Sequence, residues 1–180
     1  MLAERGATVI DADAISRSTT AVGGAAIDAI AAAFGANMLT PDGALDREQM
    51  RGLVYTDQSA RARLERIVHP LVGQAIAQQA LQADLTGVSC IVFDIPLLVE
   101  SAHWRQKLGR VVVVDCREET QIARVTARSA LSPAAVQDIV AAQATRVRRL
   151  AAADLVVYND GIALEQLRLQ VHEIGTQFGL

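Results

Sequence analysis

The sequence has few aromatic residues, one lysine and two cysteines. Phe, Trp and Tyr make up 3% of its 180 residues, and Lys107 is the one lysine among 17 basic side chains. We therefore expect any contact with a phosphate group to come from arginine, from backbone amides or from a metal ion. Cys90 and Cys116 lie in apolar runs, where isolated thiols behave as small buried hydrophobes, so no disulfide framework is expected.

Long apolar runs and several catalytic motifs are also missing. No run approaches the ~20 apolar residues of a membrane span, and no basic stretch followed by an apolar one resembles a signal peptide. The sequence has no GxGxxG, HExxH or paired CxxC motif and no Ser-His-Asp order, which argues against Rossmann, zinc and hydrolase functions. The net charge of −3 gives no reason to expect nucleic-acid binding. We expect a cytoplasmic protein that binds neither membranes nor nucleic acids.

Short apolar runs alternate with helical segments along the chain. Four runs rich in Val, Ile or Leu are predicted to be strands: residues 8–10, 89–93, 110–114 and 155–158. Continuous apolar strands separated by helices favour an α/β fold with a parallel sheet and helices on both faces. Ligands bind such sheets at the carboxyl ends of the strands. The polar residues at those ends are Asp11, Asp13, Asp94, Asp115 and Asn159.

Two other stretches are predicted to be mainly helical. Residues 20–86 form an insertion between the first two strands, with apolar side chains at helical spacing. A turn at residues 40–43 and the pair His69-Pro70 are expected to interrupt it, because the residue before a proline disfavours helix. Residues 118–150 are predicted to form a helical hairpin, and residues 162–178 a final helix. The apolar positions of the insertion fall in three groups: Ile27, Ile30 and Phe34; Met50, Leu53 and Val54; Leu64, Ile67 and Val68.

Asp11 and Asp13 are the first candidates for chemistry. They flank a single alanine at a strand end, so in extended geometry their side chains point the same way. Such a pair can bind Mg²⁺, or one carboxylate can act as a base toward a hydroxyl. The alternative is that one of them caps the following helix. Asp94 poses the same choice: an acid after an apolar strand resembles a Walker-B metal site, and a helix cap explains it as well.

Four further residues could contact a ligand. Arg124 and Arg128 are one helical turn apart, so both could close over a triphosphate, or they could belong to a solvated helix face. His69 could contact a phosphate or a ribose, or serve as a structural hydrogen-bonding residue. Asn159, in an Asn-Asp-Gly sequence, could hold a base or simply belong to a turn. Glu100, in the segment 97–100, is typical of a solvated or capping residue.

The segments together resemble the dephospho-coenzyme A kinase family. The matching strings are GATVIDADAISR, the helix from Asp46-Arg47 to Tyr55, LERIVHPLV, DIPLLVE, VVVVDCREETQIARVTAR and AAQATRVRRLAAADLVVYNDG. They occur in the family's order and spacing over most of the chain. The resemblance implies one kinase domain over residues 1–180, with a three-layer parallel sheet of the P-loop kinase type. It further implies a helical insertion at 20–86 for the acceptor substrate and a helical lid at 118–150.

The resemblance also implies a reaction and its participants. ATP would phosphorylate the ribose 3′-hydroxyl of dephospho-coenzyme A, with Mg²⁺, as the last step of coenzyme A synthesis. Asp13 would receive the hydroxyl proton, with Asp11 in support. Arg124 and Arg128 would contact the ATP phosphates, and Asn159 the adenine. The candidates for contacts with the acceptor substrate are Arg47, Arg51, His69 and Asp94. Asp94 is also the candidate metal ligand.

One family feature is not found in these 180 residues. Members begin with a strand and a GxxxxGKS loop whose amides and lysine hold the ATP phosphates. Residues 1–5 are instead predicted to be the last turn of a helix closed by Gly6. We therefore expect that the first strand, its loop and most of the following helix, roughly twenty residues, are missing, and that activity is impaired in the chain as written. The alternatives are a non-catalytic coenzyme-binding or regulatory fragment, and a receiver-like phosphoacceptor domain.

Overall fold

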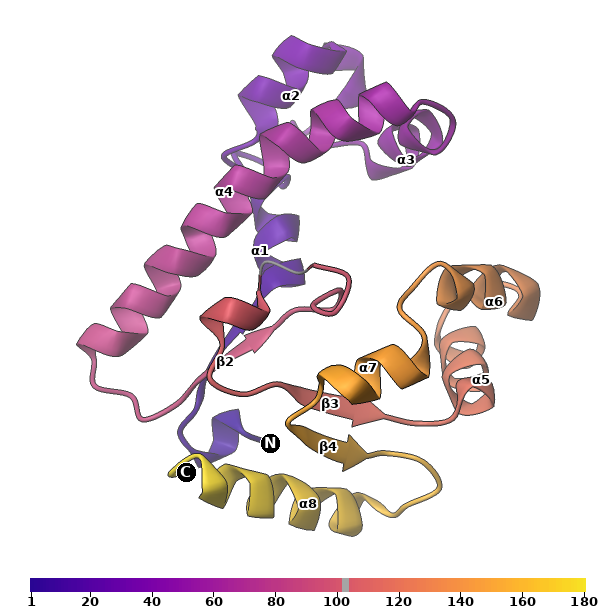
Figure 1. The fold of residues 1–180 in the computed structure, drawn as a ribbon. Helices are drawn as coiled ribbons and strands as arrows, with labels where there is room; N and C mark the ends of the chain where they lie inside the picture. The colour runs from indigo at the N-terminus through magenta and orange to yellow at the C-terminus, as the bar shows by residue number, and fades with distance from the viewer. Residues whose placement is uncertain (102–103) are drawn as a thin grey trace. The chain divides into compact units, whose positions relative to one another are not determined.

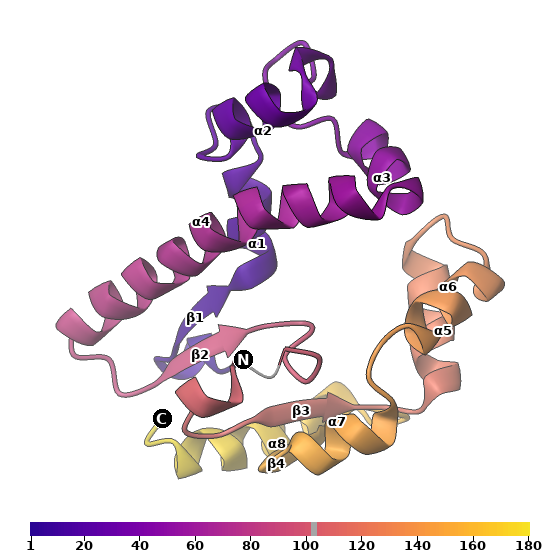
Figure 2. The same ribbon diagram turned by 45° about the horizontal axis from the view of Figure 1, so that its top comes forward.

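All four expected strands are present, and they pair in two separate sheets. The computed structural model describes residues 1–101 and 104–180. These residues divide into two units, one made of Ala7–Pro96 and the other of Met1–Gly6 with Leu97–Leu180. We call them the 7–96 unit and the 97–180 unit, the second including residues 1–6. Figures 1 and 2 show their helices and strands.

The 7–96 unit contains the first two strands. Strand β1 (Thr8–Asp11) pairs in parallel with β2 (Ile91–Asp94), in a register that sets Asp11 beside Asp94. The predicted strands 8–10 and 89–93 are confirmed with small shifts of their ends. The expected acids therefore do lie side by side at the carboxyl end of this sheet.

The 97–180 unit contains the other two strands. Strand β3 (Val112–Asp115) pairs in parallel with β4 (Leu155–Tyr158), and Asp115 is the register partner of Tyr158. Helix α7 (Arg146–Ala152) packs on β3, and α8 (Leu164–Gln177) packs on β4 (Figure 1). The parallel pairing predicted from the apolar runs is confirmed in both units.

Each unit has its own two-stranded parallel sheet within residues 1–101 and 104–180. The hydrogen-bonded pairs are β1–β2 and β3–β4, and no further described strand joins them. Apolar runs report that a strand is formed, but they do not report which strand lies beside it. Val114 in β3 is 63% exposed, so the face of the sheet on which its side chain lies is not covered at that position.

The insertion packs its helices around one apolar cluster. Its helices are α2 (Ile27–Phe34), α3 (Arg47–Thr56) and α4 (Gln58–Leu85), and Ile30 is fully buried among them. The three predicted apolar groups all meet there: Ile27, Ile30 and Met50 are buried, and Phe34, Leu53, Val54, Leu64, Ile67 and Val68 pack against them. Helical spacing in the sequence therefore identified the side chains of this core correctly.

Helix α4 does not break at His69-Pro70, which corrects the predicted interruption. It continues through Pro70 to Leu85. Proline removes one backbone donor and leaves the carbonyl of Arg66 without its helical partner. Because His69 and Pro70 are exposed, water can bind that carbonyl, and the packing of α4 against α1 (Ala12–Thr19) and α3 outweighs the lost bond.

The remaining helices follow the sequence expectations with one exception. Ser132 caps α6 (Pro133–Ala141) by accepting from the Ala135 amide at 3.2 Å. Helix α6 packs against α5 (Glu118–Arg128), which forms the expected hairpin. The exception is that the stretch 118–150 holds a third helix, α7, which packs on β3.

The described residues also form short 3₁₀ turns. The 3₁₀ turn η1 (Ala3–Arg5) ends at Gly6, whose φ of 100° lies in the left-handed region, as predicted. Two further 3₁₀ turns are η2 (Ala36–Met38) and η3 (Arg105–Lys107). In the part of the chain that the structure describes, no helix combines the length and the apolar character needed to cross a membrane.

Replacing Ile30 tests the importance of the insertion core. Ile30→Ala removes a fully buried side chain and leaves a cavity between α2, α3 and α4, so we expect a loss of about 2–5 kcal/mol in unfolding free energy. Urea denaturation followed by circular dichroism measures it. The control is Leu81→Ala in α4, because Leu81 is 61% exposed and its loss should cost no more than about 0.5 kcal/mol. Equal effects of the two substitutions would contradict this core.

Candidate functional site

In the 7–96 unit, Asp11 is used to start a helix. Its carboxylate accepts from the Ala14 amide at 2.8 Å, which makes it the N-cap of α1, and it lies 3.8 Å from Arg17. Asp13 lies in the first turn of α1 and is exposed. The capping interpretation therefore applies to Asp11 and leaves the Asp13 carboxylate available at the carboxyl end of β1.

Asp94 offers only part of a metal site. It is exposed at the end of β2, beside Asp11. Among residues 1–101 and 104–180, no three His, Cys, Asp or Glu side chains are grouped so that they could hold a metal ion. This donor set fits Mg²⁺ only in the mode in which one or two carboxylates share the ion with substrate phosphates and water.

Arg47 joins helix α3 of the insertion to the end of α1. From the first turn of α3 it donates to the Thr20 hydroxyl at 2.7 Å and to the Arg17 carbonyl at 3.2 Å, just where α1 ends. Arg51 lies one turn further along α3 and is exposed, and His69 is exposed in the middle of α4. The structure thus gives Arg47 a structural role as well and leaves Arg51 and His69 accessible to a ligand.

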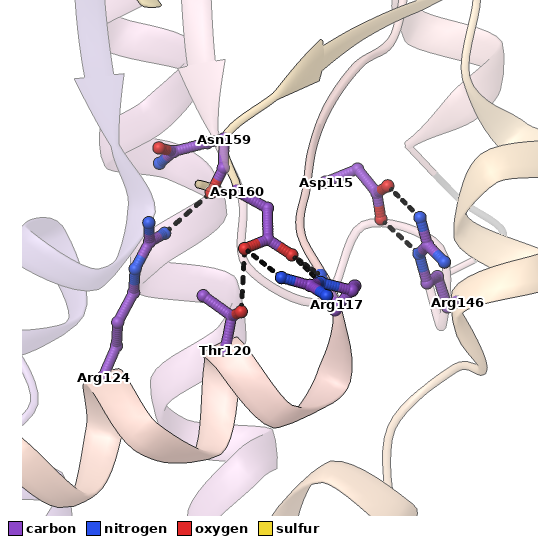
Figure 3. A network of polar contacts seen from close by, with 7 residues as sticks. All are labelled: Asp115, Arg117, Thr120, Arg124, Arg146, Asn159 and Asp160. Atoms are coloured by element: carbon purple, nitrogen blue, oxygen red, sulfur yellow. Dashed lines mark hydrogen bonds and ion pairs between the residues drawn. The ribbon is translucent and has the colours of Figure 1, made fainter. Parts of the chain in front are cut away.

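In the 97–180 unit, Asp160 is the centre of a polar network (Figure 3). It follows β4, is 6% exposed, and accepts from Arg117 through the backbone amide at 3.0 Å and Nε at 2.6 Å. The Thr120 hydroxyl donates to the same carboxylate at 2.8 Å. The Arg117 guanidinium and these hydrogen bonds hold the pKa of Asp160 far below the ordinary value of an aspartate.

Asp115 forms a second pair next to this network. At the end of β3 it is 5% exposed and binds Arg146 through two hydrogen bonds, Nε at 2.8 Å and Nη2 at 2.6 Å. This fork-like pairing lowers the pKa of Asp115, and it raises the pKa of Arg146. Arg146 is the first residue of α7, so the pair fixes that helix on the end of β3.

Two of the predicted ATP contacts are brought together. Arg124 donates from Nη1 to the Asn159 carbonyl at 2.9 Å (Figure 3). Arg128, one turn further on, is exposed at the end of α5. A cavity of about 120 Å³ opens nearby, with Arg146 and Arg149 in its wall together with residues of α5, α6 and the 143–145 segment.

The partners of the buried acids are what sequence reasoning missed. Asp160 and Arg117 are 43 residues apart, and Asp115 and Arg146 are 31 apart. An acid at a strand end predicts a polar contact, but it does not identify the partner. The excess of arginine in residues 117–149 could have indicated partners for the two acids, because this stretch lies between the two strands that end in them.

Acid should weaken the 97–180 unit through these two carboxylates. Both have a lower pKa in the folded state than the value of about 3.9 for an unfolded aspartate, so their stabilising effect is complete above that value and is lost as the pH falls below it. We expect the melting temperature of the wild-type chain to fall more steeply between about pH 4 and pH 2 than that of Asp160→Asn. The exposed Asp138→Asn variant is the control and should behave as wild type. Identical slopes for Asp160→Asn and wild type would contradict the assigned network.

Comparison with known proteins agrees with this arrangement. The family model described as "Dephospho-CoA kinase" matches residues 1–165. The dephospho-CoA kinase of Albidiferax ferrireducens is 55% identical over all 180 residues, which span 85% of that protein. The enzyme of Bordetella pertussis is 55% identical over 161 residues, which are 89% of this chain and 74% of that protein.

Solved structures agree at the level of the fold. The crystal structure of TT1252 from Thermus thermophilus has a TM-score of 0.81 at 26% identity, over 98% of this chain and 87% of that one. The dephospho-CoA kinase from Campylobacter jejuni has a TM-score of 0.67 at 22% identity, over 97% of this chain and 88% of that one. The match over residues 1–165 and the two relatives at 55% identity show that this chain belongs to the dephospho-CoA kinase family.

Proposed function

We propose that this chain transfers the γ-phosphoryl group of ATP to the ribose 3′-hydroxyl of dephospho-coenzyme A. The proposal is based on the different contacts of two acids at the end of β1. The Asp11 carboxylate caps α1, whereas Asp13 is exposed in the first turn of that helix. A carboxylate in that position is free to act on a substrate hydroxyl. Membership of the family supplies the identity of that hydroxyl.

The step requires one bond to form and one to break. The 3′-oxygen attacks the γ-phosphorus, the bond from that phosphorus to the β,γ-bridging oxygen breaks, and ADP leaves. Asp13 receives the hydroxyl proton as general base. Negative charge spreads over the phosphoryl oxygens in the transition state, and guanidinium groups next to those oxygens would stabilise it.

We assign the remaining contacts by unit. In the 97–180 unit, Arg124 and Arg128 would contact the ATP phosphates from the lid (118–150), and Asn159 would hold the adenine. The hydrogen bond from Arg124 to the Asn159 carbonyl supports a common ligand for these residues. In the 7–96 unit, the acceptor contacts would come from the insertion (20–86). The residues assigned there are Arg47, Arg51 and His69.

Asp94 is the residue that would hold Mg²⁺ in this proposal. Its exposed carboxylate at the end of β2 suits an ion that is shared with substrate phosphates. When bound, the ion would offset the negative charge of the phosphate groups.

The triphosphate also needs a cradle that these 180 residues do not encode. They contain no GxxxxGKS motif, and their one lysine, Lys107, lies in η3. Arginines can neutralise phosphate charge, but they do not replace the row of backbone amides that such a loop presents. We therefore propose that the 180-residue polypeptide alone turns over slowly. The same polypeptide preceded by a strand and GxxxxGKS loop of the family should turn over well.

Two polypeptides test the function and the role of the cradle. ADP release in the presence of dephospho-coenzyme A, ATP and Mg²⁺ should be near background for the 180 residues and clearly above it for the extended chain. Equal rates for the two polypeptides would refute the need for the cradle. Dephospho-coenzyme A binding without turnover in either polypeptide would favour a binding or regulatory module, and the receiver-like alternative predicts phosphorylation of the protein itself.

Asp13→Asn tests the general base in the extended chain. We expect turnover to fall by about 10²–10⁴-fold with little change in KM for ATP, because the amide cannot accept the hydroxyl proton. Asp28→Asn, at an exposed position of α2, is the matched control and should keep wild-type turnover. An Asp13→Asn variant with the wild-type rate would remove Asp13 from this role.

A further inference from the structure

Both ends of the α5–α6 hairpin are tied to acids outside it, whereas its turn is not. At the start, Asp160 binds the Arg117 amide and side chain. At the turn, the hydrogen bonds of Ser129 and Ser132 stay within the hairpin. Within α5, Thr120 and Arg124 also donate to Asp160 and to the Asn159 carbonyl, so the part that can tilt about the two ends runs from the last turn of α5 through α6.

The C-terminal end is held by a residue that has no role in the proposed reaction. Glu100 accepts from the Ala144 amide through Oε1 at 2.6 Å, a charge-assisted bond between residues 44 positions apart. Ala144 is 4% exposed, and its amide would lose its protein acceptor if this carboxylate were removed. The next residue, Thr145, caps α7 by accepting from the Arg148 amide, and Arg146 binds Asp115.

Three consecutive residues are thus fixed by three different contacts. Ala144 is fixed by Glu100, Thr145 by its own helix, and Arg146 by Asp115. Ala144 is the first of these three residues after α6. Its contact with Glu100 therefore marks the point at which the hairpin ends and the fixed part begins. Beyond that point lie Arg146 and Arg149, which line the 120 Å³ cavity.

We propose that Glu100 is a positioning residue that forms the C-terminal pivot of the α5–α6 hairpin. Its carboxylate holds the Ala144 amide while the hairpin moves, and it thereby keeps the start of α7, with Arg146 and Arg149, in place. The contact itself does not depend on the kinase activity. Its consequence for ATP rests on the proposed function.

Hydrogen exchange of the 180-residue chain tests the pivot without any turnover. In Glu100→Ala we expect the Ala144 amide to exchange about ten to one hundred times faster, with α8 unchanged. Glu100→Gln keeps an acceptor oxygen at the same reach and should restore slow exchange. Glu100→Asp keeps the charge but shortens the side chain, and it should behave like Glu100→Ala. The control is Glu173→Ala, at an exposed position of α8.

Each result bears on the proposal. Unchanged exchange at Ala144 in both Glu100→Ala and Glu100→Asp would overturn it. Fast exchange in Glu100→Gln would also overturn it, because charge and not the hydrogen bond would then hold the loop. In the extended chain, Glu100→Ala should raise KM for ATP more than it lowers kcat, and Glu100→Gln should reverse this. Unaltered kinetic constants together with faster exchange would refute the effect on ATP and leave the kinase function standing.

Discussion

The 97–180 unit depends on two aspartate–arginine pairs at the carboxyl ends of β3 and β4. Asp115 and Asp160 lie close enough that the charge of Asp160 raises the pKa of Asp115, so the two carboxylates repel each other. An arginine hydrogen-bonds to each carboxylate and lowers its pKa below the ordinary value of an aspartate. Those arginines begin helices: Arg117 is the N-cap of α5, and Arg146 is the first residue of α7. The same two ion pairs therefore neutralise the carboxylates at the strand ends and fix the starts of α5 and α7.

Aspartates also begin three helices of the 7–96 unit, by a different contact. Asp11, Asp46 and Asp57 cap α1, α3 and α4, and each carboxylate accepts hydrogen bonds from backbone amides. A capping carboxylate has its hydrogen-bond donors within the next three residues and does not require an arginine from a distant part of the chain. This is why the second acid of the Asp11-Ala-Asp13 sequence matters: with the cap already supplied by Asp11, the Asp13 carboxylate has no structural duty among the described contacts.

Local patterns in the sequence predicted local structure well. Strand 155–158 follows from an apolar run, and the turn that ends at Gly6 follows from the preference of glycine for the left-handed region. Predictions that depended on distant partners fared differently. The pairing of β1 with β2 and of β3 with β4 could not be predicted, because apolar runs do not encode which strand is the neighbour. The break at Pro70 was wrong because tertiary packing outweighed a local preference. Asp160 and Glu100 found partners more than 40 residues away, which spacing cannot reveal.

Family membership and the geometry of Asp13 together support a kinase that acts on a ribose hydroxyl. The most direct measurement is the position of the new phosphate after the extended chain has reacted with ATP and dephospho-coenzyme A. Phosphorus NMR of the purified product distinguishes a phosphomonoester on the ribose 3′-oxygen from one at any other oxygen, and from free phosphate. This account predicts the 3′-phosphomonoester, formed together with ADP. Phosphate released to water, or attached at another position, would contradict it.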